Sequence, residues 1–302
     1  MRMPSFLRIL LGNAKASTGL AIVVLFVVVS IGAPLIAQHE PDRRVARPHE
    51  APSAEHVLGT TRMGRDVFSQ VLHGGRVSIS VGVGAGLIVC ALAVAIGVTA
   101  GYFGGLVDEA LTFVMNVMLV IPQLPLLFVL AAFLGETSPL TIALIIGMTS
   151  WAWGARVVRA QTLALREKEF VKAAQVLGEP AWRIVLVEIL PNLISIIGAT
   201  FIGSVMYAIM TEATLEYLGL GDPNIVSWGI MLYNIQTSSS ILVGAWWEVI
   251  APCAALILLV IGLALLNFSI DEIANPQLRS HRGGGRLKRL FARKPRLQEE
   301  AA

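Results

Sequence analysis

The stretch SISVGVGAGLIVCALAVAIGVTAG, residues 78–101, contains no charged side chain over its whole length. A helix rises about 1.5 Å per residue, so this stretch is long enough to cross a bilayer core of about 30 Å. Five further uncharged, apolar stretches lie near residues 19–38, 111–134, 139–155, 190–211 and 249–270. The sequence therefore predicts an all-α integral membrane protein with six transmembrane helices.

The composition favours the same fold class. Of the 302 residues, 55% are hydrophobic and only 14% are charged, and the mean hydropathy is +0.73. A soluble domain has about 25% charged residues, so lipid is expected to be part of this chain's solvent. Arg2, Arg8 and Lys15 precede the first apolar run, as in a secretory signal peptide. That run is too long for a signal peptide and no clean small-residue cleavage site follows it, which favours a membrane anchor.

The basic residues predict the orientation. Of the 23 Lys and Arg residues, 17 lie in the N-terminal segment, between the fourth and fifth spans, or in the C-terminal tail. The connections at 135–138 and 212–248 contain none. Because cytoplasmic segments carry an excess of Lys and Arg, both termini are predicted to be cytoplasmic. The first long loop departs from this rule, since it holds Arg43, Arg44, Arg47, Arg62, Arg65 and Arg76.

This topology divides the chain into three parts. Residues 1–77 hold the N-terminal tail, the first helix and an external loop; residues 78–271 hold five helices; residues 272–302 form a cytoplasmic tail. The tail is basic, rich in Gly at its start and without a long apolar run, so it is predicted to be disordered. Attraction of this tail to anionic lipid head groups is a secondary possibility.

Neither a metal site nor a catalytic site is predicted. Cys90 and Cys253 lie inside apolar spans and are read as small hydrophobic residues. The five histidines are not closely spaced along the chain with other His, Cys or acidic residues, and no HExxH motif is present: His39, His49, His56, His73 and His281. The spans also hold no paired acidic or His residues and no Ser nucleophile motif, which argues against an intramembrane hydrolase.

Two spans carry features of helix packing and of a pathway. The second span repeats glycine every four residues, at Gly82 and Gly86 and again at 97, 101 and 105, which lets neighbouring helices approach closely. Pro122 and Pro125 should bend or interrupt the third span. Such a break either borders the transport pathway, with Asn116 and Gln123 beside it, or is a simple kink.

The middles of the spans contain no Asp, Glu, Lys or Arg. A proton-driven carrier usually needs an ionisable relay at that depth, so this mechanism is disfavoured.

The segment REKEFVKAAQVLGEPAWRIVLVEILPNL, residues 166–193, predicts two short helices between the fourth and fifth spans. The first carries Phe170, Ala173, Ala174 and Leu177 at helical spacing, Gly178 suits its left-handed C-terminal turn, and Pro180 suits the start of the next helix. It is either an amphipathic connector or a docking element that the Ala173–Ala174 pair brings close to a partner.

This segment resembles the EAA loop of ABC importer permeases, in which a short coupling helix fits a cleft of the ATP-binding subunit. Ala173, Ala174 and Gly178 match the pattern, and residues 189–191 match its end. Lys172 stands where the family has Glu, so a polar contact at that position is not carried over. The resemblance implies an ATPase-coupling role for Phe170, Ala173, Ala174, Leu177 and Gly178 within residues 166–191.

Two further segments resemble the dipeptide, oligopeptide and nickel branch of these permeases. Residues 56–82 contain Gly64, Arg65, Asp66, Gly74, Arg76 and Ser78 of its motif before the second span, with Thr61 where Asp is usual. Residues 211–232 contain Glu212, Leu218, Gly219, Gly221, Ser227, Trp228 and Gly229 of its motif after the fifth span. Arg65 and Asp66 either contact a binding protein or pair within the loop, and Glu212 and Glu216 are open to the same two interpretations, with a helix-end cap favoured.

The resemblance implies a type I ABC importer transmembrane domain in the bacterial cytoplasmic membrane. The expected partners are a homologous second permease, two ATP-binding subunits and an external solute-binding protein, besides membrane lipid; no nucleic acid is expected. Because the chain has no GxxxxGK[ST] phosphate loop, ATP and Mg would be bound by partner subunits and no cofactor by this chain. Peptides are the expected substrate; the alternatives are nickel chelates or oligosaccharides and, more distantly, a self-contained carrier or channel.

Overall fold

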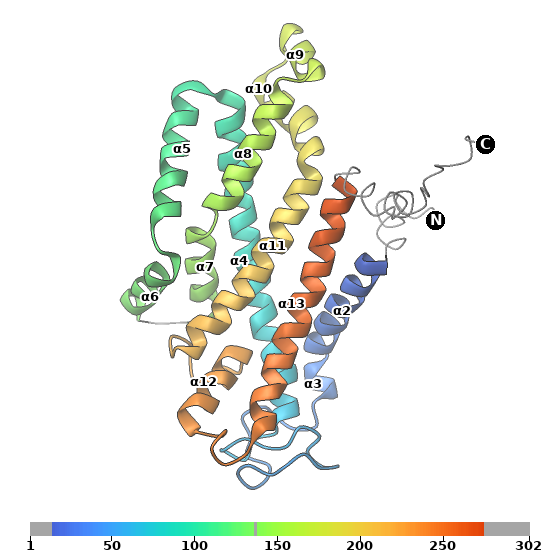
Figure 1. Cartoon of the computed structure of the whole chain (residues 1–302), viewed down its shortest axis with the longest axis vertical. Coiled ribbons are helices and arrows are strands. Elements are labelled where there is room, and N and C mark those ends of the chain that lie inside the picture. Colours follow the sequence, from blue (N-terminus) through green and yellow to red (C-terminus); the bar gives the residue numbers. More distant parts are fainter. Residues whose placement is uncertain (1–13, 136–137, 275–302) are drawn as a thin grey trace, which may run out of the picture.

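The computed structural model describes residues 14–135 and 138–274. Within these ranges every element longer than an isolated bridge is a helix (Figure 1). Two isolated β-bridges, between residues 44 and 65 and between 60 and 66, are confined to the first loop. The helices are α2 (Ala14–Ile31), α3 (Ala33–Ile36), α4 (Val67–Phe103), α5 (Gly105–Val120), α6 (Gln123–Leu134), α7 (Pro139–Thr149), α8 (Ala152–Arg166), α9 (Glu169–Val176), α10 (Ala181–Arg183), the π-helical turn η1 (Ile184–Ile189), α11 (Leu190–Tyr217), α12 (Trp228–Ser238) and α13 (Trp246–Ala274).

The predicted number of membrane spans is matched by the helices. Four spans are long and apolar enough by themselves: α2, α4, the continuous segment Ala181–Tyr217, and α13. Two more arise if each bent pair counts as one span, α5 with α6 at 87° and α7 with α8 at 43°. The larger bend lies at residues 121–122, as the prolines of that segment predict, because Pro122 supplies no backbone N–H to continue the helix.

Helix α4 is the central helix of the bundle, and its 37 residues give it a length of roughly 55 Å. Its glycines form two close contacts. A Cβ on Gly86 would lie 2.6 Å from Val205 of α11, and a Cβ on Gly97 would lie 2.6 Å from the Ala155 carbonyl oxygen of α8. Both contacts are too short for any larger residue, so the glycine repeat sets how closely α4 packs against α8 and α11.

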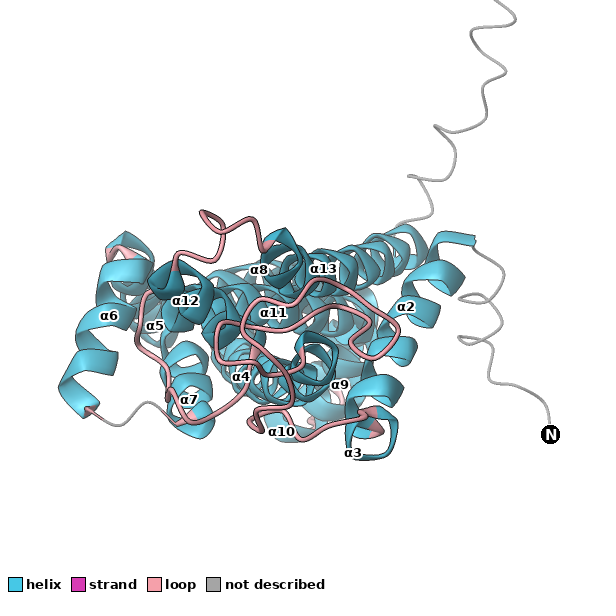
Figure 2. Cartoon of the chain, turned by 90° about the horizontal axis from the view of Figure 1, so that it is seen from below, coloured by secondary structure: helices cyan, strands magenta, loops and turns pink. Residues whose placement is uncertain are grey.

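The two ends of the bundle differ. The start of α2 and the end of α13 point toward the end at which α9 lies, whereas the loop of residues 37–66 crosses the opposite end (Figures 1 and 2). We refer to these as the α9 end and the loop end. The cytoplasmic location of both termini, which the basic residues predict, stays a prediction, because residues 1–13 and 275–302 lie outside the described residues. Most of the tail 272–302 lies outside the described residues, so its predicted disorder and its predicted attraction to lipid stay predictions.

Helix α12 lies within the connection 212–248, where no span was predicted. Ser227 caps it by accepting a hydrogen bond from the Ile230 N–H at 3.1 Å. Trp228 anchors it, since its ring is almost fully buried and its Nε1 donates to the Val71 carbonyl oxygen at 2.9 Å. A helix of 11 residues is too short to cross a bilayer, so hydropathy did not reveal it. The proposed boundary at 77/78 also falls inside α4.

Candidate functional site

A cavity of ≈ 530 Å³ lies among the helices of the bundle, including α4 and the two helices, α8 and α11, that pack against its glycines. Helix α11 supplies half of its wall, and the remainder comes from α4, the start of α6, the α7–α8 junction with α8, and α13. The lining residues are Val89, Gln123, Ser150, Trp153, Gly154, Val157, Ile196, Ala199, Thr200, Gly203, Ser204, Met206, Tyr207 and Asn267. None of these residues is charged. The cavity therefore offers hydrogen bonds and apolar contacts without a fixed charge.

The broken helix positions one polar group of this wall. Gln123 begins α6 directly after the bend, and its Nε2 donates to Ser150 Oγ at 2.8 Å. Gln123 is the one of the four predicted pathway residues that lines the cavity. Pro122 and Pro125 form the bend and the first turn of α6. Asn116 lies elsewhere, and its Oδ1 accepts a hydrogen bond from Arg156 at 2.7 Å.

A second polar group was not found from the sequence. Asn267 of α13 lines the cavity, and its Oδ1 is buried without a hydrogen-bond partner among the described residues. A buried carbonyl oxygen without a partner costs free energy, typically about 1–3 kcal/mol. Asn267 thus provides an acceptor that a molecule inside the cavity would satisfy. The only available signal was a polar amide side chain within the apolar run 249–270, where Ser269 is also polar.

The charged side chains of α8 lie outside the cavity lining, and one of them, Arg159, forms an ion pair. Arg159 Nη2 donates to Asp108 Oδ2 at 2.6 Å, and Arg159 Nε donates to Asp108 Oδ1. This bidentate pair joins α8 to the start of α5. Because a bidentate pair of Arg and carboxylate fixes orientation as well as charge, it locks these two helices together.

The predicted coupling residues lie on α9, which projects beyond the bundle, and on the two residues that follow it (Figure 1). Val171 is fully buried at its base, and Ala174 packs against the same core. Ala173 is exposed, and Leu177 is 81% exposed. Gly178 adopts φ +77°, the left-handed turn that the sequence predicts there. Phe170 is about half-buried, with 40% of its surface exposed.

The tip of this element presents apolar side chains to its surroundings. Val176, Leu177 and Trp182 are all strongly exposed. At the base of the tip, Lys172 Nζ lies 2.9 Å from Glu167 Oε2, and this hydrogen bond lowers the pKa of the Glu167 carboxyl. The residue that departs from the family pattern is therefore used in a solvent-exposed ion pair within the chain.

At the loop end, buried polar groups join three helices. Ser78 of α4 donates to Glu212 Oε1 of α11 at 3.1 Å. Ser227, the cap of α12, donates to Glu216 Oε2. Both carboxyl groups are almost fully buried, so Glu212 and Glu216 hold α4, α11 and α12 together rather than capping an exposed helix end.

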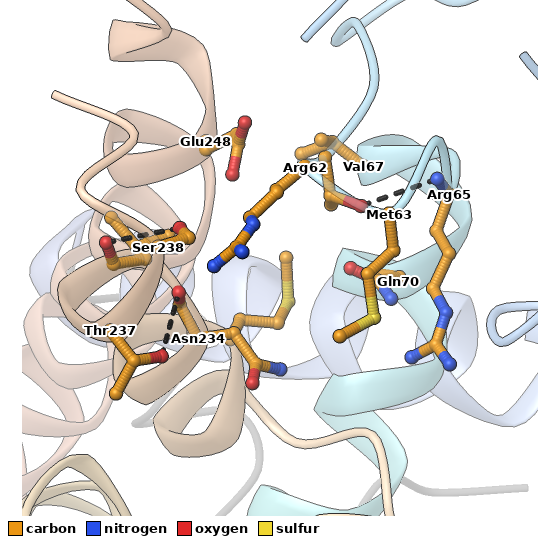
Figure 3. Close-up of a pocket in the computed structure, with 12 residues that line it drawn as sticks. Arg62, Met63, Arg65, Val67, Gln70, Asn234, Thr237, Ser238 and Glu248 are labelled. Atoms are coloured by element: carbon orange, nitrogen blue, oxygen red, sulfur yellow. Dashed lines mark hydrogen bonds between the residues drawn. The ribbon is translucent and has the colours of Figure 1, made fainter. Parts of the chain in front are cut away.

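Arg65 and Asp66 occupy different environments although they are adjacent. Asp66 is buried and caps α4 by accepting from the Ser69 N–H at 2.7 Å. Arg65 instead lines a small pocket at the loop end (Figure 3). That pocket also includes Arg62 and Glu248, and Glu248 is held by His49 Nδ1 at 2.7 Å. Asp66 is thus shielded from any partner protein, whereas Arg65 is partly accessible.

The structure corrects the expectation that no histidines cluster with acidic residues. His39, His56 and Asp66 each place one ligand-type atom within 4.8 Å of the others. Sequence spacing did not reveal this cluster because the folded loop, not a helix or a short motif, brings the three residues together.

Residues 93–280 match the profile of the family described as binding-protein-dependent transport system inner membrane component. The dipeptide transport system permease protein DppC of Bacillus subtilis (strain 168) is 32% identical over 269 residues, covering 88% of this chain and 83% of that protein. The oligopeptide transport system permease protein OppC of the same strain is 31% identical, covering 88% and 87%. DppC of Alkalihalophilus pseudofirmus is 33% identical, covering 89% and 88%.

Proposed function

This chain belongs to the family of binding-protein-dependent transport system inner membrane components, and from that premise we propose that it forms half of the pathway of an ATP-driven peptide importer. It is a multi-pass protein of the cytoplasmic membrane and a permease subunit. The observation that carries the proposal is the uncharged cavity together with the exposed helical element at one end of the same bundle.

The cavity suits a solute that varies in side chain and charge. Its polar groups, including Gln123, Thr200 and Asn267, offer hydrogen bonds to amide groups, which all peptides share. The absence of charge from its lining avoids strong preference for one type of side chain. A homologous second permease supplies the other half of the pathway, and an external solute-binding protein selects the peptide.

The α9 end faces the cytoplasm in this proposal, and α9 docks into an ATP-binding subunit. Its exposed apolar tip is the surface that such a partner would cover. From α10 through η1 to α11 the chain is helical without interruption, from Ala181 to Tyr217. Movement of α10 on ATP binding is therefore transmitted to residues 196–207, which line the cavity.

The peptide assignment comes from the relatives, which are named as dipeptide or oligopeptide transport permeases. No ATP-binding motif is present in this chain, so two partner subunits bind and hydrolyse ATP with Mg.

The substitution Ala173→Arg tests the coupling role. Ala173 is exposed, so the chain itself accommodates the larger side chain, but the added bulk and charge should block docking. We expect normal folding and loss of ATP-dependent peptide uptake in liposomes that contain the complete importer. Gln175→Arg is the matched control, because position 175 is also exposed and lies about 200° around the helix from 173. Normal uptake and normal ATPase assembly with Ala173→Arg would disprove the assignment.

The same liposomes separate the importer from a self-contained carrier or channel. Peptide uptake should require both ATP and the ATP-binding subunits. Equal uptake by liposomes that contain this chain alone would favour the carrier.

A further inference from the structure

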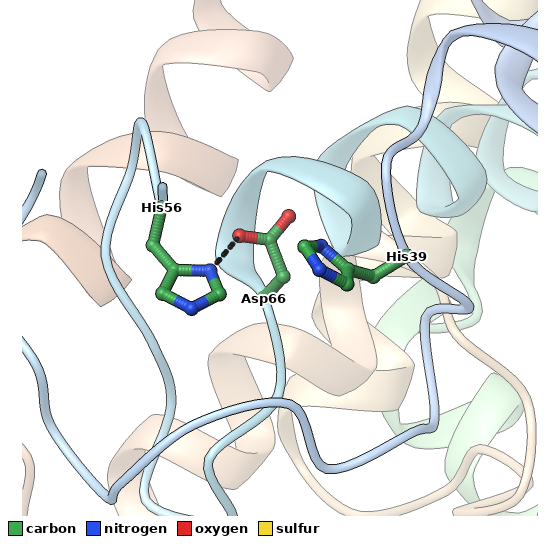
Figure 4. Close-up of side chains that lie close together, drawn as sticks. All are labelled: His39, His56 and Asp66. Atoms are coloured by element: carbon green, nitrogen blue, oxygen red, sulfur yellow. Dashed lines mark hydrogen bonds and ion pairs between the residues drawn. The ribbon is translucent and has the colours of Figure 1, made fainter. Parts of the chain in front are cut away.

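Three potential metal ligands converge at the loop end from separate points of the chain. His39 follows α3, His56 lies in the middle of the loop, and Asp66 immediately precedes α4. One ligand-type atom of each lies within 4.8 Å of the others (Figure 4). None of the three contributes to the cavity or to the α9 end.

The spacing of the cluster is close to that of a metal centre. His56 Nδ1 lies 3.1 Å from Asp66 Oδ1. Two ligands bound tetrahedrally at 2.0–2.1 Å from Zn²⁺ lie about 3.3 Å from each other. His56 and Asp66 are only 6% and 2% exposed, so the site excludes most competing water. A small inward movement of the third group would complete a three-ligand set.

The hydrogen bond between His56 and Asp66 accounts for two of the three residues, but it leaves the ring of His39 without a role. Its Nδ1 is buried and has no hydrogen-bond partner among the described residues. Its ring lies against that of His56, with 5.4 Å between the ring centroids. A metal ion would bond to a buried nitrogen lone pair that nothing else satisfies.

The carboxylate of Asp66 is already oriented for such a role. Its Oδ2 accepts hydrogen bonds from the Ser69 N–H and the Ser69 Oγ, both at 2.7 Å. These bonds leave Oδ1 directed at His56. Hydrogen bonds of this kind fix ligand geometry and strengthen metal binding.

We propose that His39, His56 and Asp66 bind a transition-metal dication, with Zn²⁺ as the best fit. Two imidazole nitrogens and one carboxylate oxygen are a ligand set that Zn²⁺ accepts, with water in the fourth position, whereas Mg²⁺ and Ca²⁺ prefer oxygen ligands throughout. The ion joins the end of α3, the middle of the loop and the start of α4. Its role is to hold the external loop in one conformation.

Metal binding by the full-length chain, purified without a polyhistidine tag and stripped with a chelator, tests this proposal. Equilibrium dialysis against Zn²⁺, followed by metal analysis, should give one bound ion per chain, and an excess of Mg²⁺ should not displace it. His39→Ala should weaken Zn²⁺ binding at least about tenfold, because even loss of a supporting hydrogen bond costs 10- to 100-fold. His73→Ala is the matched control, since His73 lies near the same end but outside the cluster.

A chain that binds no Zn²⁺ in the dialysis, or a His39→Ala variant that binds it as tightly as the unaltered chain, would overturn the proposal. If His39→Ala does not fold, Co²⁺ replaces the variant as the probe. The unaltered chain should then show the intense visible absorption of four-coordinate Co²⁺, which Zn²⁺ abolishes. No such absorption would also overturn the proposal.

Discussion

The loop end and the α9 end of this bundle differ in which kind of side chain is in an unusual place: polar groups are buried at the first, and apolar groups are exposed at the second. At the loop end, the polar side chains of Glu212, Glu216 and Asp66 are buried, and each accepts a hydrogen bond from within the chain: Asp66 from Ser69 in the same helical turn, and the two glutamates from Ser78 and Ser227 of other segments. At the α9 end, apolar side chains such as Val176 and Leu177 are exposed. Exposed apolar groups in a cluster mark an interaction surface. The loop end is thus held together by hydrogen bonds within the chain, whereas the α9 end leaves apolar side chains exposed, as the proposed docking role requires.

The largest expected effect on stability is at the loop end. In Gly229→Ala the new Cβ would lie 2.6 Å from Glu216 Oε2 and 2.9 Å from the Cα of Ala213. Because the second contact is with backbone, α12 must shift, and we expect a loss of about 2–3 kcal/mol in the free energy of unfolding. Gly198→Ala is the matched control, since its Cβ would meet its nearest neighbour at 3.8 Å. Equal stability of the two variants, measured by denaturation in micelles, would contradict this packing.

A smaller effect is expected from Asp66→Ala. This substitution removes the N-cap of α4 and the partner of His56, and cap removal alone costs about 0.5–2 kcal/mol. Asp66→Asn keeps a cap acceptor and should retain most of the stability in the absence of metal. Denaturation with a chelator present measures both variants. If Asp66→Asn proves as unstable as Asp66→Ala, the carboxylate charge rather than the cap is responsible.

The smallest effect is expected at the α9 end. Leu177→Ser removes apolar surface that is already exposed, so the free energy of unfolding should change by less than about 0.5 kcal/mol. Uptake by the complete importer should nevertheless fall, because Leu177 belongs to the proposed docking surface. Val171→Ser in the same helix is the contrasting control, since Val171 is fully buried and its loss should destabilise the chain. A large stability loss with Leu177→Ser would show that the tip is packed within the chain.

The sequence predicted those features that depend on neighbours along the chain. The uncharged runs marked the spans, the prolines at 122 and 125 marked the bend, and Gly178 with Pro180 marked the turn after α9. The contacts that it did not predict join distant residues. Ser78 and Glu212 are separated by 134 positions, and no local pattern indicates that they meet. That Asn267 and Gln123 line the same cavity likewise depends on how α13 packs.

The π-helical turn η1 affects how α9 and α10 are rotated relative to the cavity wall on α11. A π turn bonds each residue to the one five positions away, so it holds one more residue than an α-helical turn would. Conversion of Ile184–Ile189 to α-helix with the same number of residues would rotate α9 and α10 by about 100° relative to the cavity wall, because one more residue would be wound into the α-helix. The direction in which α9 and α10 point is therefore set by whether this single turn is π-helical or α-helical.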